Sequence, residues 1–173
     1  MTVRIRIVGV GSPAGDDRLG WLAARALRRR AALAVLIPQV VTIAGFDRPG
    51  MGLLQGLEGL TALIVVDAVR SGAAAGTLHR LGVSEVTHVC GVLSSHGFGL
   101  AQTLELGLAM GWLPPQVTVF GLEMAAADAG SESLSAKVAA AMPVLIQSVE
   151  REVLEELARD SRAPLGGVRR SRG

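Results

Sequence analysis

Aromatic residues are scarce in this chain of 173 residues, which contains two Trp, three Phe and no Tyr. Half of the residues are nevertheless hydrophobic, so the core must be built from Ala, Val, Leu and Ile. Modules that bind carbohydrate or single-stranded nucleic acid depend on stacking rings, and the composition disfavours both. An aliphatic core of this kind is typical of α/β domains.

Cysteine is scarcer still, because Cys90 is the only one in the sequence. A single cysteine excludes an internal disulfide and a cysteine-rich zinc site. No run approaches the ~20 uninterrupted apolar residues of a membrane helix, and the first residues lack the pattern of a signal peptide. We therefore expect a soluble, cytoplasmic protein without a membrane partner.

Excess charge is also small, with a formal net charge of +2. Residues 159–173 contain five arginines and one aspartate, so this segment carries +4 and residues 1–158 carry −2. We predict one α/β domain over residues 1–158 and a basic, disordered tail over residues 159–173. We interpret the tail as a solvated terminus rather than an arm that binds nucleic acid.

Strand-like and helix-like patterns alternate along the domain. The sequence predicts strands at 3–10, 34–44 (an edge strand or bulge, because it contains Pro38), 60–66, 76–81 and 117–122. It predicts helices from 16 or 17 to 30, at 51–57, at 98–110 and at 131–158. This alternation predicts a three-layer α/β sandwich, in which helices cover both faces of a mostly parallel, twisted sheet of about five strands. Ligands of such sheets bind at the carboxyl ends of the strands, where the strand order reverses.

An acidic pair follows the first predicted strand in the segment GVGSPAGDD, where Asp16 and Asp17 are adjacent. One interpretation is a helix cap followed by an acid in the first helical turn. The other is a carboxylate held at the ligand-binding edge of the sheet. The segment by itself favours the cap.

Two further residues follow predicted strands. Asp67 ends the apolar run TALIVVD, and His96 lies in SSHGFG before a predicted helix, whereas His79 and His88 are interpreted as surface or edge residues. Because Asp17, Asp67 and His96 follow separate strands, the fold can bring them to one edge. Two carboxylates and an imidazole suit an open site for a borderline divalent metal such as nickel or zinc.

A nucleotide site is the alternative. Gly9, Gly11 and Ala14 match the dinucleotide-binding spacing G-x-G-x-x-A between a strand and a helix. Pro13 removes a backbone donor from that loop, and the acidic pair repels phosphate at the helix start. A non-proteolytic nucleotide-binding domain therefore stays as a second hypothesis.

Over residues 3–158 the sequence resembles the hydrogenase maturation endopeptidases, which process the large subunits of nickel-iron hydrogenases. Four stretches carry the resemblance: GVGSPAGDDRLG, LIVVDAVRSG, SSHGFGLAQTLELGLAMGWLPPQVTVFGLEM and the long C-terminal helix. The resemblance implies a monomeric endopeptidase that removes a C-terminal extension from a hydrogenase large-subunit precursor after nickel insertion. It implies that Asp17, Asp67 and His96 are the metal-binding and catalytic residues, with the nickel presented by the precursor.

The first motif departs from the family pattern GNP-x-x-GDDG. Ser12 stands in place of Asn, Arg18 in place of Gly, and the loop is one residue shorter before the acids. The choice between Asp16 and Asp17 as the first ligand is therefore open. A third hypothesis is a scaffold or metal-chaperone role that keeps nickel recognition without cleavage.

Overall fold

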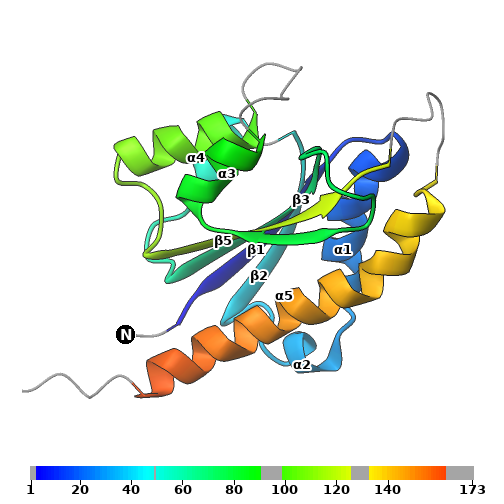
Figure 1. The fold of residues 1–173 in the computed structure, drawn as a ribbon. Helices are drawn as coiled ribbons and strands as arrows, with labels where there is room; N and C mark the ends of the chain where they lie inside the picture. Colours follow the sequence, from blue (N-terminus) through cyan, green and yellow to red (C-terminus); the bar gives the residue numbers. More distant parts are fainter. Residues whose placement is uncertain (1–2, 49, 91–98, 126–132, 163–173) are drawn as a thin grey trace, which may run out of the picture.

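The protein is a five-stranded sheet with helices on both faces, in a computed structural model that describes residues 3–48, 50–90, 99–125 and 133–162 (Figure 1). The strands are β1 (Ile5–Gly11), β2 (Val41–Asp47), β3 (Ala62–Val69), β4 (Leu78–Leu81) and β5 (Gln116–Glu123). Their order is β2-β1-β3-β5-β4. All neighbours pair in parallel except β4, which is antiparallel to β5. The predicted fold class is confirmed.

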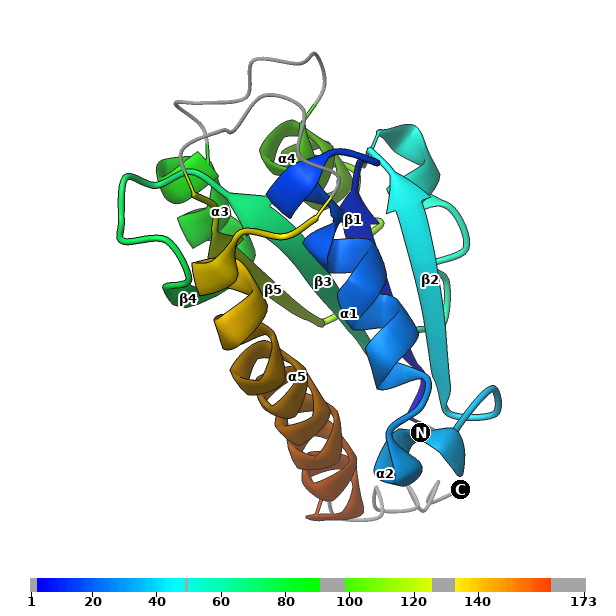
Figure 2. The same ribbon diagram turned by 90° about the vertical axis from the view of Figure 1, so that its right-hand side faces the viewer.

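Two aliphatic clusters hold the layers together. One cluster joins the sheet to α1 (Leu19–Leu27) and α5 (Ala136–Arg162), which lie on the same face (Figure 2). The other joins the opposite face to α4 (Leu100–Ala109), α3 (Val83–Cys90) and the 3-10 turn η2 (Met51–Leu54). The strands alternate between the clusters, because successive side chains point to opposite faces. Ile7 of β1 joins the first cluster and Val8 joins the second.

The start of α1 lies unusually close to β1. A Cβ atom at Gly9 would meet the backbone oxygen of Gly20 at 1.9 Å, and one at Gly20 would meet the oxygen of Val10 at the same distance. Both contacts are with backbone, which cannot rotate away. These glycines therefore allow helix and strand to approach, and they bring the residues before α1 against the end of β1.

The predicted strand over residues 34–44 is wrong in its first half. Residues 31–34 form the short helix α2 (Ala31–Ala34), and β2 begins only at Val41. Val35, assigned to the strand by its apolar character, is 81% exposed. Pro38 cannot donate to a ladder, so pairing starts after it. The predicted edge position is confirmed, because β2 is the outermost strand on its side.

Other elements also differ from the predictions. The helix predicted at 51–57 is only the 3-10 turn η2, and the strand predicted at 60–66 is β3, Ala62–Val69. The helix predicted to open at the acidic pair is preceded by a 3-10 turn, η1 (Gly15–Arg18), and α1 itself begins at Leu19. The helix α3 was not predicted. At the other end, α5 continues through Pro143 to Arg162, so residues 159–162, assigned to the tail, are helical. Residues 163–173 lie outside the described part of the chain. No helix among the described residues is long and apolar enough to cross a membrane.

Candidate functional site

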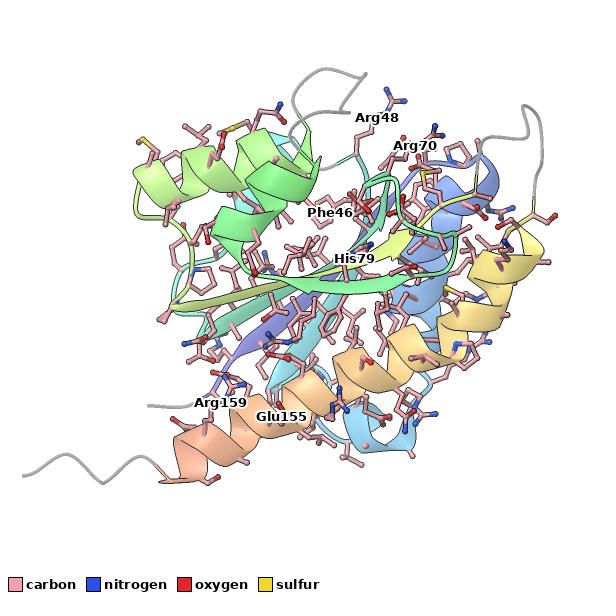
Figure 3. The ribbon with its side chains drawn as sticks, viewed as in Figure 1. Phe46, Arg48, Arg70, His79, Glu155 and Arg159 are labelled. Atoms are coloured by element: carbon pink, nitrogen blue, oxygen red, sulfur yellow. The ribbon has the colours of Figure 1, made fainter. Side chains whose placement is uncertain are left out.

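The strand order reverses between β1 and β3. From β1 the chain crosses to β2 on one side, and β3 then pairs with β1 on the other side. Gly9 pairs with Val66, so Asp67 is one residue beyond the last paired position of the two strands. Figure 3 labels Arg48 and Arg70 at this carboxyl edge of the sheet, and Arg159 towards the opposite end of the molecule. Crevices at such reversals are the usual ligand sites of open α/β sheets.

Asp67 is a partly buried carboxyl group within β3, rather than the residue after the strand. Its Oδ1 accepts a hydrogen bond from the backbone N–H of Ala68 at 2.8 Å. Burial raises the pKa of Asp67 to about 7, and the negative charge of Asp17 adds to the rise, while the Ala68 hydrogen bond opposes it. A carboxyl group that titrates near neutral pH is suited to proton transfer or to binding a cation.

Asp17 lies at the same edge as Asp67, because its turn η1 directly follows β1 and contacts β3. The backbone of the turn is held by Asp17 N–H to the oxygen of Ala14 at 3.1 Å, and by Ser12 N–H to the oxygen of Asp17 at 3.2 Å. Among the described residues, none donates a hydrogen bond to its side chain.

The side chain of its neighbour Asp16, in contrast, accepts several hydrogen bonds. Asp16 is 8% exposed, and its Oδ1 accepts from the N–H of Ser135 at 2.6 Å. Its Oδ2 accepts from the N–H of Ala125 and from the hydroxyl of Ser135, both at 2.9 Å. The expected helix cap is wrong, because the cap positions of η1 and α1 are Ala14 and Arg18, and neither makes a side-chain cap bond. The contacts favour Asp17 over Asp16 as a metal ligand.

The third predicted ligand, His96, lies outside the described residues, and so do its neighbours Val92 and Leu93. The helix that follows, α4, leads into β5, which begins at the amino edge of the sheet. The start of α4 therefore lies towards the carboxyl edge of the sheet (Figure 1). Within the described ranges no three His, Cys, Asp or Glu side chains form a group that could hold a metal. A role for His96 remains a prediction.

Glu123, which the sequence reasoning missed, is a buried carboxylate at the end of β5 and is 3% exposed. It accepts hydrogen bonds from the N–H of Ser71 at 2.9 Å, the N–H of Gly72 at 3.0 Å and the hydroxyl of Ser71 at 2.6 Å. Burial by itself would raise the pKa of Glu123, but these hydrogen bonds and His79 together lower it. The signal that pointed to Asp67, an acid closing an apolar run, is also present in VTVFGLE.

His79 lies on the outermost strand β4, as the edge interpretation predicted, but its side chain also contacts a buried carboxylate. It projects from β4 (Figure 3), with its Nε2 3.3 Å from Glu123 Oε2 and 3.4 Å from the Ser71 hydroxyl. This cluster is not a Ser-His-acid triad, because one ring nitrogen faces both partners, whereas a triad uses both nitrogens. The Ser71 hydroxyl already donates to Glu123, whose lowered pKa makes it a weak base. The hydrogen bonds from Ser71 and Gly72 to Glu123 hold the loop after β3 against the end of β5.

The glycine-rich loop is explained by packing rather than by a nucleotide. A Cβ atom at Gly11 would meet the backbone oxygen of Asp17 at 2.3 Å, so the turn η1 fills the space beside it. Gly9 faces Gly20 of α1 in the same manner. The two acidic residues of η1 would also repel a pyrophosphate at this loop. The nucleotide hypothesis therefore loses its main support.

Comparison with known proteins agrees with the fold. Residues 40–152 match the family model HycI, hydrogenase maturation protease. The chain is 28% identical over 152 residues to the hydrogenase expression/formation protein HupD of Rhodobacter capsulatus, covering 87% of this chain and 71% of HupD. The fold is similar to the hydrogenase maturating endopeptidase HybD from E. coli, with 26% identity, a TM-score of 0.72 and coverage of 88% and 93% of the two chains. It is also similar to the solution structure of an endopeptidase from Escherichia coli, with 27% identity, a TM-score of 0.72 and coverage of 92% and 94%. This chain belongs to the hydrogenase maturation protease family.

Proposed function

We propose that this protein is an endopeptidase that removes the C-terminal extension of a nickel-iron hydrogenase large-subunit precursor after nickel insertion. The observation that carries the proposal is the meeting of Asp17 and Asp67 at the strand-order reversal, where the charge of one raises the pKa of the other. Membership of the protease family supports the reaction class. The precursor is the substrate partner, and the enzyme acts as a monomer in the cytoplasm.

Nickel in this proposal belongs to the precursor and is recognised by Asp17, Asp67 and His96. Carboxylate oxygens and an imidazole nitrogen form a donor set that a borderline divalent ion accepts, with positions left for water or a substrate carbonyl. A metal at such a site polarises a carbonyl and lowers the pKa of bound water. The two described carboxylates fit this role, because Asp17 has no hydrogen-bond donor among the described residues and Asp67 has only the N–H of Ala68.

Asp67 is also the residue we propose for proton transfer. Its pKa of about 7 lets it hold or release a proton near neutral pH. A carboxyl group with an ordinary pKa near 3.8 would be a much weaker base. Burial is the main cause of this high pKa, and the charge of Asp17, in the turn after β1, adds to it.

A panel of purified variants tests the site with nickel-loaded precursor as substrate. We expect Asp17→Ala, Asp67→Ala and His96→Ala to lower cleavage by about 100-fold or more, the usual scale for a group that acts in the reaction. The matched control is Asp47→Ala, because Asp47 is an exposed carboxylate at the end of β2, at the same edge of the sheet. Cleavage that persists in all three variants would contradict the site. Nickel binding without cleavage by the wild type would favour the scaffold hypothesis.

A further inference from the structure

The turn that carries Asp17 is too short to hold its own geometry. η1 has four residues, a single 3-10 turn with poor hydrogen-bond geometry and little intrinsic stability. Inside the turn, Asp17 N–H bonds Ala14 at 3.1 Å, and the oxygen of Asp17 accepts from Ser12 at 3.2 Å. External contacts must therefore set the direction of the Asp17 side chain.

The neighbouring side chain supplies those contacts. Both oxygens of Asp16 are occupied by donors from two distant segments, Ala125 just after β5 and Ser135 just before α5. Because Asp16 is almost fully buried, each of these bonds offsets part of the cost of removing a carboxylate from water. The two segments thus anchor η1 through the side chain of Asp16, next to Asp17 in the turn.

The same strand end also holds the segment after Asp67. Glu123, two residues before Ala125, accepts the N–H groups of Ser71 and Gly72. Residues 123–125 therefore connect the turn that carries Asp17 with the loop that follows β3. We call this connection, made by Asp16, Ser135 and residues 123–125, the β5 brace.

We propose that Asp16 is a positioning residue for the hydrolysis: through the β5 brace it fixes the turn η1, so that the Asp17 carboxylate faces Asp67 in the geometry that cleavage needs. This inference rests on the proposed function and assigns Asp16 a role distinct from metal binding. A displacement of about 1 Å at a reacting group can lower the rate about 100-fold. Asp16 therefore acts on the rate of the step and not on the binding of the precursor.

Asp16→Asn is the informative variant, since it keeps the size of the side chain. The amide oxygen can still accept from the N–H of Ser135, but an amide nitrogen in the place of Oδ2 cannot accept from Ala125. Ser135→Ala removes only the hydroxyl bond, and Ser135→Thr keeps a hydroxyl in that position. The Ser135 pair thus provides a conservative rescue that does not touch Asp16.

The measurements are kcat and KM for nickel-loaded precursor, the melting temperature, and amide hydrogen exchange at Ser12, whose N–H reports on η1. We expect Asp16→Asn to lower kcat about 10- to 100-fold, with KM changed less than about threefold and Ser12 exchanging faster. We expect Ser135→Ala to lower kcat by a smaller factor and Ser135→Thr to restore it. Rates are corrected for the folded fraction, so that loss of stability is not counted as loss of kcat.

Full kcat per folded molecule in Asp16→Asn, with wild-type cleavage normal, contradicts the inference and leaves the proposed function intact. Should Asp16→Asn not fold, equal kcat in Ser135→Ala and Ser135→Thr contradicts it as well. A rise in KM at unchanged kcat would assign Asp16 to substrate binding and overturn the positioning role. Absence of cleavage by the wild type contradicts the proposed function itself, and the role in hydrolysis falls with it.

Discussion

Asp67 is held in a state that is unfavourable for a carboxylate. Its pKa of about 7 lies well above the ordinary 3.8, and the main cause is burial. An acid with a raised folded-state pKa stays protonated in the folded protein over a pH range in which the unfolded chain is already ionised. The folded state therefore loses stability between these two pKa values, which is the expected signature of a functional group.

Asp67→Asn should stabilise the protein while abolishing cleavage. Below about pH 4 both folded and unfolded Asp67 are protonated, so the variant and the wild type should unfold with similar free energies. From pH 4 to 7 the wild type loses stability, and above pH 7 the difference should be constant at about 2–4 kcal/mol in favour of the variant. Urea unfolding of both proteins at pH 4, 6 and 8 measures this difference in the free energy of unfolding. A difference that does not change over this range would contradict the pKa assignment.

The sequence identified a candidate site residue only where that residue lies at the end of a predicted strand. Asp67 closes a buried run, and that position alone identified it. Asp16 and Asp17 could not be told apart, because the partners of Asp16, at positions 125 and 135, are more than one hundred residues away. The contact between His79 and Glu123, which joins β4 to the end of β5, also links residues that are distant in the sequence and was not predicted.

At the scale of elements, the contact between β1 and α1 has the tightest geometry near the site. The glycines at 9 and 20 allow backbone to meet backbone, and the turn η1 follows from that approach. The strand β1 and the apolar face of α1 were predictable from the spacing of hydrophobic residues along the sequence. The loop glycines were ambiguous, because close helix packing and phosphate binding both require a small residue.

Gly9→Ala should destabilise the protein by about 3 kcal/mol or more. The added Cβ would lie 1.9 Å from the oxygen of Gly20, so α1 must shift away from β1. The control is Gly45→Ala in β2, where the nearest atom, Trp21 Cδ1, is 3.6 Å from the added Cβ and in ordinary contact. Thermal unfolding of both variants provides the comparison. A loss at position 9 no larger than at position 45 would contradict the close approach.

The fold of the whole molecule was predictable because the pattern of a strand followed by a helix recurs along the chain. Apolar strands alternating with amphipathic helices leave few arrangements other than a layered α/β sheet. Errors arose where a local rule competed with tertiary context, as at residues 34–40, where apolar residues resemble a strand but Pro38 delays pairing until Val41. The candidate site followed from the same topology, because the reversal between β1 and β3 brings Asp17 and Asp67 to one edge.

Intact-mass measurement of a hydrogenase large-subunit precursor, incubated with the wild-type protein, tests the central claim most directly. Nickel-loaded and nickel-free precursor are compared at the same concentration and pH. We predict that the nickel-loaded precursor loses its C-terminal extension as a single fragment, whereas the nickel-free precursor keeps its full mass. Equal cleavage of both forms would contradict nickel recognition by Asp17, Asp67 and His96, and an unchanged mass for both would contradict the proposed endopeptidase activity.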